Sequence, residues 1–215
     1  MGNKPKSNYA ANPFTLNEKD QFQTPEYAFA PLIPYLRKAG FKTIWESACG
    51  EGYLAQWIAN AGFEVYGTDL LGGHSRLSQI VEKGKKRYEG RTPGCVPHDY
   101  QCEITNLPFS LKYIWLEIAC RIGRPFAFLA PTDMIMAGRK FAPLMKKYAI
   151  EVLAPLQRID YKTPNKGWNG SSAQMHTSWF TMGLGIGQFW TYVDIVKPST
   201  RKPKRDTGQL VMEWL

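Results

Sequence analysis

The sequence lacks any long run of apolar residues. Its longest stretch without Asp, Glu, Lys or Arg, residues 167–193, is interrupted by Asn169, Gln174, His176 and several glycines, which a membrane core would not accept. No apolar stretch follows the polar residues 1–6, so we expect no secretory signal. We therefore predict a protein without membrane contact that works in the cytoplasm, or in a host cytoplasm if the protein is viral.

Cysteine is also scarce, with 4 residues in 215. Cys49, Cys95, Cys102 and Cys120 show neither the close pairs of a zinc site nor the density of a disulfide scaffold. We expect reduced thiols and no bound metal.

Acidic residues are fewer than basic ones: the chain has 18 Asp and Glu and 27 Lys and Arg, which gives a net charge of +9. With 44% hydrophobic and 21% charged residues, the chain is neither a disordered tail nor a fibrous protein. The basic residues cluster within residues 83–91, at 146–147 and within 197–205. Such a balance favours a polyanionic partner, although each cluster alone is equally consistent with a solvated face.

The order of apolar patterns predicts one α/β domain. We predict a flexible arm over residues 1–17, a single domain over residues 18–195 and a basic tail over residues 196–215. Strand, helix and strand follow one another early in the domain, an order that forces parallel pairing through a right-handed crossover. We therefore expect a doubly wound, mostly parallel sheet with helices on both faces and an antiparallel C-terminal hairpin.

The individual elements are predicted from periodicity and from turn residues. The predicted helices cover residues 25–40, 53–61, 75–88, 111–122 and 137–148. The predicted strands cover residues 42–45, 63–68, 103–105, 125–129, 150–153, 178–184 and 189–193.

A glycine-containing turn lies between the first predicted strand and the next helix. Residues 50–55 fit the pattern G-x-G-x-x-A, in which glycines let a ligand approach the backbone closely. Asp69 follows 17 residues beyond Gly52, at the tip of the second strand, where a carboxylate can accept hydrogen bonds from ribose hydroxyls. The combination predicts a ligand that contains a nucleoside.

The acidic residue before this turn bears on which nucleoside binds. Glu46 stands at the end of the first strand, four residues before Gly50, and its carboxylate would repel a pyrophosphate. S-adenosylmethionine has no phosphate and carries a sulfonium and an ammonium group, so Glu46 favours it over a dinucleotide. The alternatives are that Glu46 caps the helix, pairs with Lys42 or points into solvent.

Three motifs, at residues 21–25, 46–52 and 106–109, follow one another in the chain. In this order they resemble the motifs of the class I S-adenosylmethionine-dependent amino-methyltransferases. Residues 21–25 (Gln-Phe-Gln-Thr-Pro) are similar to a Thr-Pro motif that contacts the methionine part of the cofactor. Residues 46–52 (Glu-Ser-Ala-Cys-Gly-Glu-Gly) are similar to the Asp/Glu-Pro-Ala-Cys-Gly-x-Gly cofactor loop. Residues 106–109 (Asn-Leu-Pro-Phe) are similar to the Asn-Pro-Pro-Phe type of catalytic turn. The sequence most resembles small phage-type DNA adenine-N6 methyltransferases.

The resemblance implies a Rossmann-like fold and methyl transfer to the exocyclic N6 amine of adenine in double-stranded DNA. An aromatic amine is a poor nucleophile, and two acceptors aimed at its N–H bonds, the Asn106 side-chain oxygen and the Leu107 carbonyl, would hold it in line with the methyl group. Phe109 would stack on the target base after it is flipped out of the duplex. Pro108 biases Leu107 toward extended backbone, which helps to fix its carbonyl.

The resemblance also implies the full set of site residues. The predicted catalytic residues are Asn106, Leu107, Pro108 and Phe109, and the predicted residues for S-adenosylmethionine are Gln21, Thr24, Pro25, Glu46, Ala48, Cys49, Gly50, Gly52, Asp69, Leu70 and Asp99.

Two departures from the family pattern keep alternatives open. Leu107 replaces the first proline of the catalytic turn, as in ribosomal RNA adenine dimethyltransferases, which leaves RNA open as a substrate. Asp99 is only the nearest acidic residue to the position that contacts the cofactor adenine. Methylation of a protein glutamine uses the same turn, and a non-catalytic protein that keeps the fold and binds nucleic acid or cofactor is the alternative outside enzymes. The oligomeric state is left open.

Overall fold

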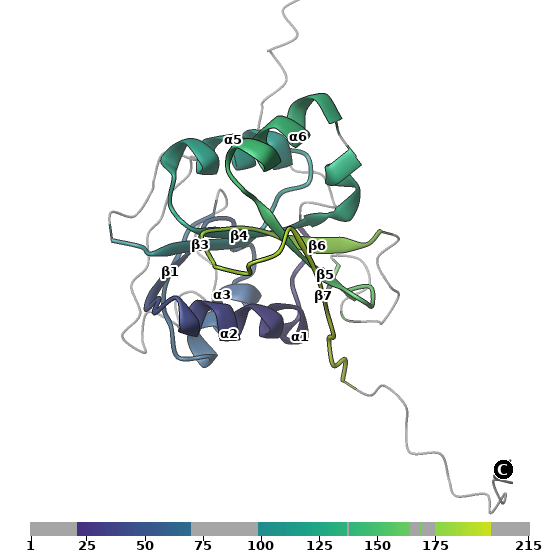
Figure 1. Ribbon diagram of the computed structural model, residues 1–215. Helices are drawn as coiled ribbons and strands as arrows, with labels where there is room; N and C mark the ends of the chain where they lie inside the picture. The colour runs from purple at the N-terminus through teal and green to yellow at the C-terminus, as the bar shows by residue number, and fades with distance from the viewer. Residues whose placement is uncertain (1–20, 70–98, 137, 164–167, 169–174, 199–215) are drawn as a thin grey trace, which may run out of the picture.

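The computed structural model describes residues 21–69, 99–136, 138–163, 168 and 175–198. One sheet runs through the middle of the described domain, with α5 (Lys112–Ile122) and α6 (Gly138–Lys147) on one face and three helices near the N-terminus on the other (Figure 1). These three are α1 (Glu26–Phe29), α2 (Ile33–Lys38) and α3 (Tyr53–Asn60). The predicted arm, the predicted helix over residues 75–88 and most of the predicted tail lie outside the described residues.

The sheet has seven strands among the described residues, in the order β2-β1-β3-β4-β6-β5-β7. Their bounds are β1 (Thr43–Glu46), β2 (Glu64–Gly67), β3 (Cys102–Asn106), β4 (Phe126–Pro131), β5 (Glu151–Pro155), β6 (Thr177–Met182) and β7 (Trp190–Val193). Each corresponds to a predicted strand to within about two residues. The doubly wound, mostly parallel α/β fold with helices on both faces is confirmed.

The strand order reverses between β1 and β3. From β1 the chain crosses through α3 to β2 on one side, whereas β3 pairs parallel with β1 on the other side. Connections leave β1 and β3 in opposite directions, and in such sheets the ligand crevice is expected at the carboxyl ends of these two strands. Glu46 ends β1 and Asn106 ends β3, so the fold brings two of the predicted site residues to this crevice.

The predicted C-terminal hairpin is wrong in its pairing. β6 is antiparallel to both β4 and β5 and lies between them, whereas β7 pairs parallel with β5 at the edge. The physical reason is burial: Trp179 and Phe180 point to opposite faces of β6 and are both fully buried, which requires a central strand. In β7, Tyr192 is 66% exposed, as suits an edge strand.

The predicted helix over residues 25–40 is divided. A short 3₁₀ helix, η2 (Ala30–Leu32), separates α1 from α2, and Pro31 and Pro34 stand at the starts of η2 and α2. Proline lacks the N–H that a continuous helix would bond to the carbonyl four residues earlier. The buried residues Phe29, Leu32 and Leu36 still share one face and pack under the sheet.

Two apolar layers hold the helices to the sheet. Ile44, Val65 and Ile104 belong to the layer under α1, α2 and α3. Phe128 and Phe180 belong to the layer under α5 and α6. Alternate residues of β4 thus enter opposite layers, and the sheet is buried on both faces, which fixes the strand ends that carry the site.

Candidate active site

Glu46 and Asn106 meet at the carboxyl edge of the sheet because β1 and β3 are parallel neighbours. Thr105, next to Asn106, donates a hydrogen bond of 2.6 Å from its Oγ1 to Glu46 Oε1. Thr105 is completely buried and Glu46 is 1% exposed. The hydrogen bond joins the two strand ends, so the positions of the acidic and the amide side chain are fixed relative to each other.

Glu46 is a buried carboxyl group with unused hydrogen-bonding capacity. Its Oε2 has no hydrogen-bond partner among the described residues. Burial raises the pKa of Glu46 to about 8, against the lowering effect of the Thr105 hydrogen bond, and the nearby Asp69 raises the pKa further. A cation beside Oε2 would stabilise the carboxylate form. The helix-cap, Lys42-pair and solvent alternatives do not fit this burial and these contacts.

The backbone of the glycine turn is satisfied internally. Each backbone N–H from residue 49 to residue 52 has an acceptor within the chain. Cys49 N–H donates to Thr68 O at 3.0 Å, and Gly52 N–H donates to Cys49 O at 2.7 Å. The other two N–H groups donate to side chains: Gly50 N–H to Asp69 Oδ2 at 2.7 Å, and Glu51 N–H to Gln23 Oε1 at 3.1 Å. A phosphate-binding turn instead points free N–H groups at its ligand. This turn can approach a ligand closely, but it has no donors left for a phosphate.

Gln23 is a site residue that the sequence interpretation missed. Its side chain lies over the turn, where a Cβ atom added to Gly50 would stand 2.7 Å from Gln23 Nε2. Gly50 also has a φ of +50°, which favours glycine. The backbone of Gln23 pairs in both directions with Lys162, whose ammonium group bonds the Glu51 carboxylate. The adjacent Thr24-Pro25 motif was the only signal in the sequence for this role.

Asn106 has one half of its amide fixed and the other half unpaired. Its Nδ2 donates to the carbonyl oxygen of Phe22 at 2.9 Å, and because a carbonyl can only accept, this contact sets the orientation of the amide. Asn106 Oδ1 is buried and has no hydrogen-bond partner among the described residues. An oriented, desolvated acceptor at this position can bind the N–H group of a ligand.

Aromatic side chains gather beside this acceptor. Phe109 is 7% exposed, and its ring meets that of Phe22 edge-to-face, with centroids 6.3 Å apart. Phe22 stacks in turn on Tyr161 at 5.8 Å. The predicted base-stacking residue is therefore covered in part by a second aromatic residue, Phe22, which the sequence motifs did not single out.

Among the remaining predicted site residues, four have a described position or contact, and the roles of others stay predictions. Thr24 is buried at the same edge and its Oγ1 has no hydrogen-bond partner among the described residues, while Pro25 is the N-cap of α1. Leu107 donates its N–H to Leu129 O at 3.0 Å and Cys49 is buried in the turn. The contact of Asp69 with ribose stays a prediction, as do the roles of Gln21, Ala48 and Pro108.

Asp99 is not brought together with the others. It precedes β3, whereas Asn106 ends that strand, and its Oδ2 accepts a hydrogen bond of 2.6 Å from the Tyr66 hydroxyl. Its contact with the cofactor adenine stays a prediction. Leu70 lies outside the described residues.

In the described part of the chain no group of His, Cys, Asp and Glu could hold a metal, and no helix there is long and apolar enough to cross a membrane.

No family model matches the chain, and no curated protein matches it in sequence. Solved structures match in fold. A protein from Pyrococcus horikoshii described as an RNA methyltransferase has a TM-score of 0.56 and 16% identity, covering 76% of this chain and 86% of that chain. A protein from Vibrio vulnificus YJ016 described as the modification subunit of a type I restriction enzyme has a TM-score of 0.54 and 10% identity, covering 84% of this chain and 48% of that chain.

These similarities define the class of fold. The chain has the class I S-adenosylmethionine-dependent methyltransferase fold, as its sequence motifs implied, with one antiparallel strand inserted in a parallel sheet. It spans about half the length of the Vibrio subunit.

Proposed function

We propose that the protein is an S-adenosylmethionine-dependent N-methyltransferase that acts on the exocyclic N6 amine of adenine in DNA. The observation that carries the proposal is the amide of Asn106, whose oxygen is buried, oriented and unpaired at the end of β3. The motif resemblance assigns a catalytic acceptor to this same atom.

The cofactor part of the site fits S-adenosylmethionine by charge. S-adenosylmethionine supplies an electrophilic methyl group on a sulfonium. Glu46 would bind the cationic methionine part through its unpaired Oε2, and Thr24 Oγ1 is a second unpaired buried atom on the predicted methionine side. A dinucleotide fits poorly because the N–H groups of residues 49–52 are all in use. The residues present therefore suit a cationic cofactor without phosphate.

Asn106 and Leu107 would orient the target amine. The Phe22 carbonyl holds the Asn106 amide by its nitrogen, so Oδ1 stays available to accept one N–H bond of the substrate. The hydrogen bond from Leu107 N–H to Leu129 O fixes the peptide between Asn106 and Leu107. Pro108 biases Leu107 toward extended backbone, which favours a fixed Leu107 carbonyl for the second N–H. Two acceptors localise the nitrogen lone pair toward the methyl group without removing a proton first, and the product proton can leave to water afterwards.

The choice of DNA rests on resemblance and charge. The net charge of +9 favours a polyanion, and Phe109 with Phe22 offers aromatic surface for a flipped base. RNA adenine is the alternative that Leu107 favours, because the same substitution occurs in RNA adenine dimethyltransferases. Glutamine methylation in a protein fits the same two acceptors but not the positive charge.

The test is transfer of labelled methyl from S-adenosylmethionine to unmethylated duplex DNA, with RNA, denatured DNA and a protein lysate in parallel. We expect N6-methyladenine in the duplex sample after nucleoside analysis. Label only in RNA or only in protein would replace the proposed substrate with an alternative. No label in any sample, with cofactor binding measured by calorimetry, would leave a non-catalytic binder.

A further inference from the structure

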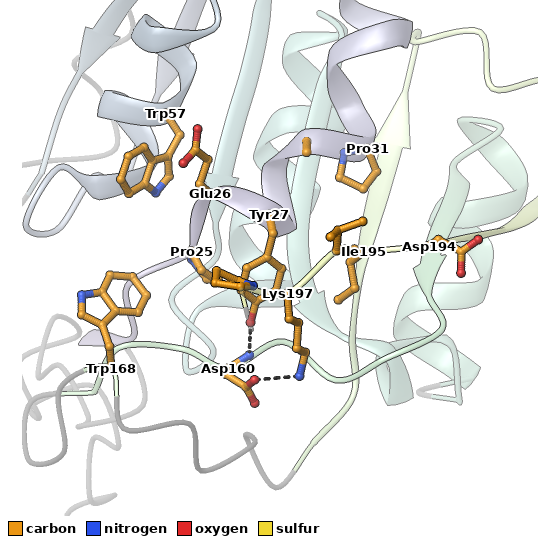
Figure 2. A pocket seen from close by; sticks show the side chains of 13 residues that line it. Pro25, Glu26, Tyr27, Pro31, Trp57, Asp160, Trp168, Asp194, Ile195 and Lys197 are labelled. Atoms are coloured by element: carbon orange, nitrogen blue, oxygen red, sulfur yellow. Dashed lines mark hydrogen bonds and ion pairs between the residues drawn. The ribbon is translucent and has the colours of Figure 1, made fainter. Parts of the chain in front are cut away.

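A cavity lies beside α1, next to the predicted cofactor residue Pro25. It has a volume of about 1110 Å³ and is lined by apolar and aromatic side chains, mainly Pro25, Tyr27, Pro31, Trp57, Trp168 and Ile195. Figure 2 shows Trp57 and Trp168 on one side of it and Pro31 and Ile195 on the other. Trp57 donates its Nε1 hydrogen to Thr24 O, which fixes the ring on the wall.

The charges around this cavity are opposite to those of the whole protein. Three carboxylates line it, those of Glu26, Asp160 and Asp194, against the single lysine Lys197. The side-chain carboxylates of Glu26 and Asp194 have no hydrogen bond or ion pair among the described residues, whereas Asp160 Oδ2 accepts a hydrogen bond from Lys197 Nζ at 2.7 Å. In a chain with a net charge of +9, a cavity lined by two unpaired carboxylates and by aromatic rings suits a cationic occupant and disfavours a phosphate backbone.

The chain supplies a matching segment next to the cavity. The described residues end at Pro198, which itself lines the wall, and the chain continues for 17 residues beyond it. The first of these, residues 199–205 (Ser-Thr-Arg-Lys-Pro-Lys-Arg), hold four basic residues and no acidic one. Lys197, directly before this segment, is already paired with Asp160 in the wall.

We propose that this cavity is the docking site for residues 199–205 of the same chain. Basic side chains of the segment pair with Glu26 and Asp194 and lie against the Trp57 and Trp168 rings. Attachment through Pro198 keeps the segment at a high effective concentration, so a few weak contacts suffice. Docking is electrostatic, and salt or a polyanion releases the segment. It requires no methyl transfer and is tested without cofactor or nucleic acid.

The test is limited trypsin digestion of the full-length protein, with the rate of cleavage after Arg201, Lys204 and Arg205 followed by mass spectrometry. The variant Glu26→Gln/Asp194→Asn removes both unpaired carboxylates. Glu64→Gln/Glu117→Gln makes the same change in net charge on β2 and α5, away from the cavity. Circular dichroism and the cleavage rate of the folded domain check that the variants are folded.

We expect the cavity variant to be cleaved in the segment about three to ten times faster than the wild type, as loss of two partly exposed ion pairs allows. The control variant should match the wild type, and 0.5 M NaCl should remove the difference. Equal rates in all three proteins at low salt would overturn the proposal. Protection that grows with protein concentration would also overturn it, because the segment would then occupy a second copy.

Discussion

The glycine turn and the turn at residues 106–109 lie at neighbouring strand ends, but their polar atoms differ in hydrogen bonding. In the glycine turn every backbone N–H from residue 49 to residue 52 is bonded within the chain. In the turn at residues 106–109, Asn106 Oδ1 is buried without a partner among the described residues. The first turn therefore contributes shape, whereas the second contributes an acceptor, since an unpaired buried polar atom is costly unless a ligand binds it.

The largest expected effect concerns the acceptor. Asn106→Ala should lower methyl transfer about 100- to 1000-fold, because removing one preorganised polar contact to the reacting group has an effect of this size. Binding of S-adenosylhomocysteine, measured by calorimetry, should change little. Asn60→Ala, at the exposed end of α3, is the matched control. Equal activity of the two variants would remove Asn106 from the chemistry.

A Cβ atom added to the glycine turn should test whether the close approach of this turn to its ligand matters for binding. Gly50→Ala forces a non-glycine residue to a φ of +50° and into Gln23 Nε2. We expect loss of about 1–2 kcal/mol in the free energy of unfolding from the left-handed conformation, and cofactor affinity lowered at least about tenfold because the turn must shift.

The control for this change is Gly40→Ala, where φ is +73° but an added Cβ meets nothing within 4 Å. It should show a similar loss of stability in urea unfolding and unchanged cofactor affinity. Gln23→Ala combined with Gly50→Ala should recover part of the cofactor affinity. If Gly50→Ala and Gly40→Ala bind the cofactor equally well, the turn does not contact it.

The buried carboxyl group of Glu46 should make both the stability of the protein and its affinity for the cofactor depend on pH. Its pKa of about 8 lies above that of an ordinary carboxyl group, so its contribution to stability is present below about pH 4.5 and is lost as the pH rises toward 8. S-adenosylhomocysteine lacks the sulfonium of S-adenosylmethionine but keeps its ammonium group. Because an ammonium group beside Oε2 needs the carboxylate form of Glu46, affinity for S-adenosylhomocysteine should rise with pH up to about 8, by up to about tenfold per unit. Glu46→Gln should bind weakly with a flatter pH profile. A wild-type affinity independent of pH between 6 and 8 would contradict the assigned role.

The smallest expected effect concerns the link between the glycine turn and Lys162. The Lys162–Glu51 ion pair is partly exposed, so a double-mutant cycle with Lys162→Met and Glu51→Gln should give a coupling of about 0.2–1 kcal/mol in urea unfolding. The coupling should fall in 0.5 M NaCl. A larger, salt-independent coupling would mean that Lys162 holds the turn by more than charge.

The sequence alone predicted the strands, most helix bounds and the residues that meet at the crevice. This was possible because apolar spacing and glycine positions are local features, and because parallel strands with short crossovers have few arrangements. Glu46 and Asn106 could be placed at strand ends without any knowledge of their neighbours. The charge of Glu46 disfavours a dinucleotide at the sequence level, and that remains a prediction.

Only the tertiary structure decided the contacts between segments far apart in the chain. The Asn106 amide is oriented by Phe22, 84 residues earlier, and Gln23 pairs with Lys162 across the site. β7 lies beyond β5 instead of beside β6 because burial of β6 on both faces outweighs the proximity of β6 and β7 in sequence. Local patterns encode which side chains must be buried, but which distant groups satisfy them is settled only when the layers pack together.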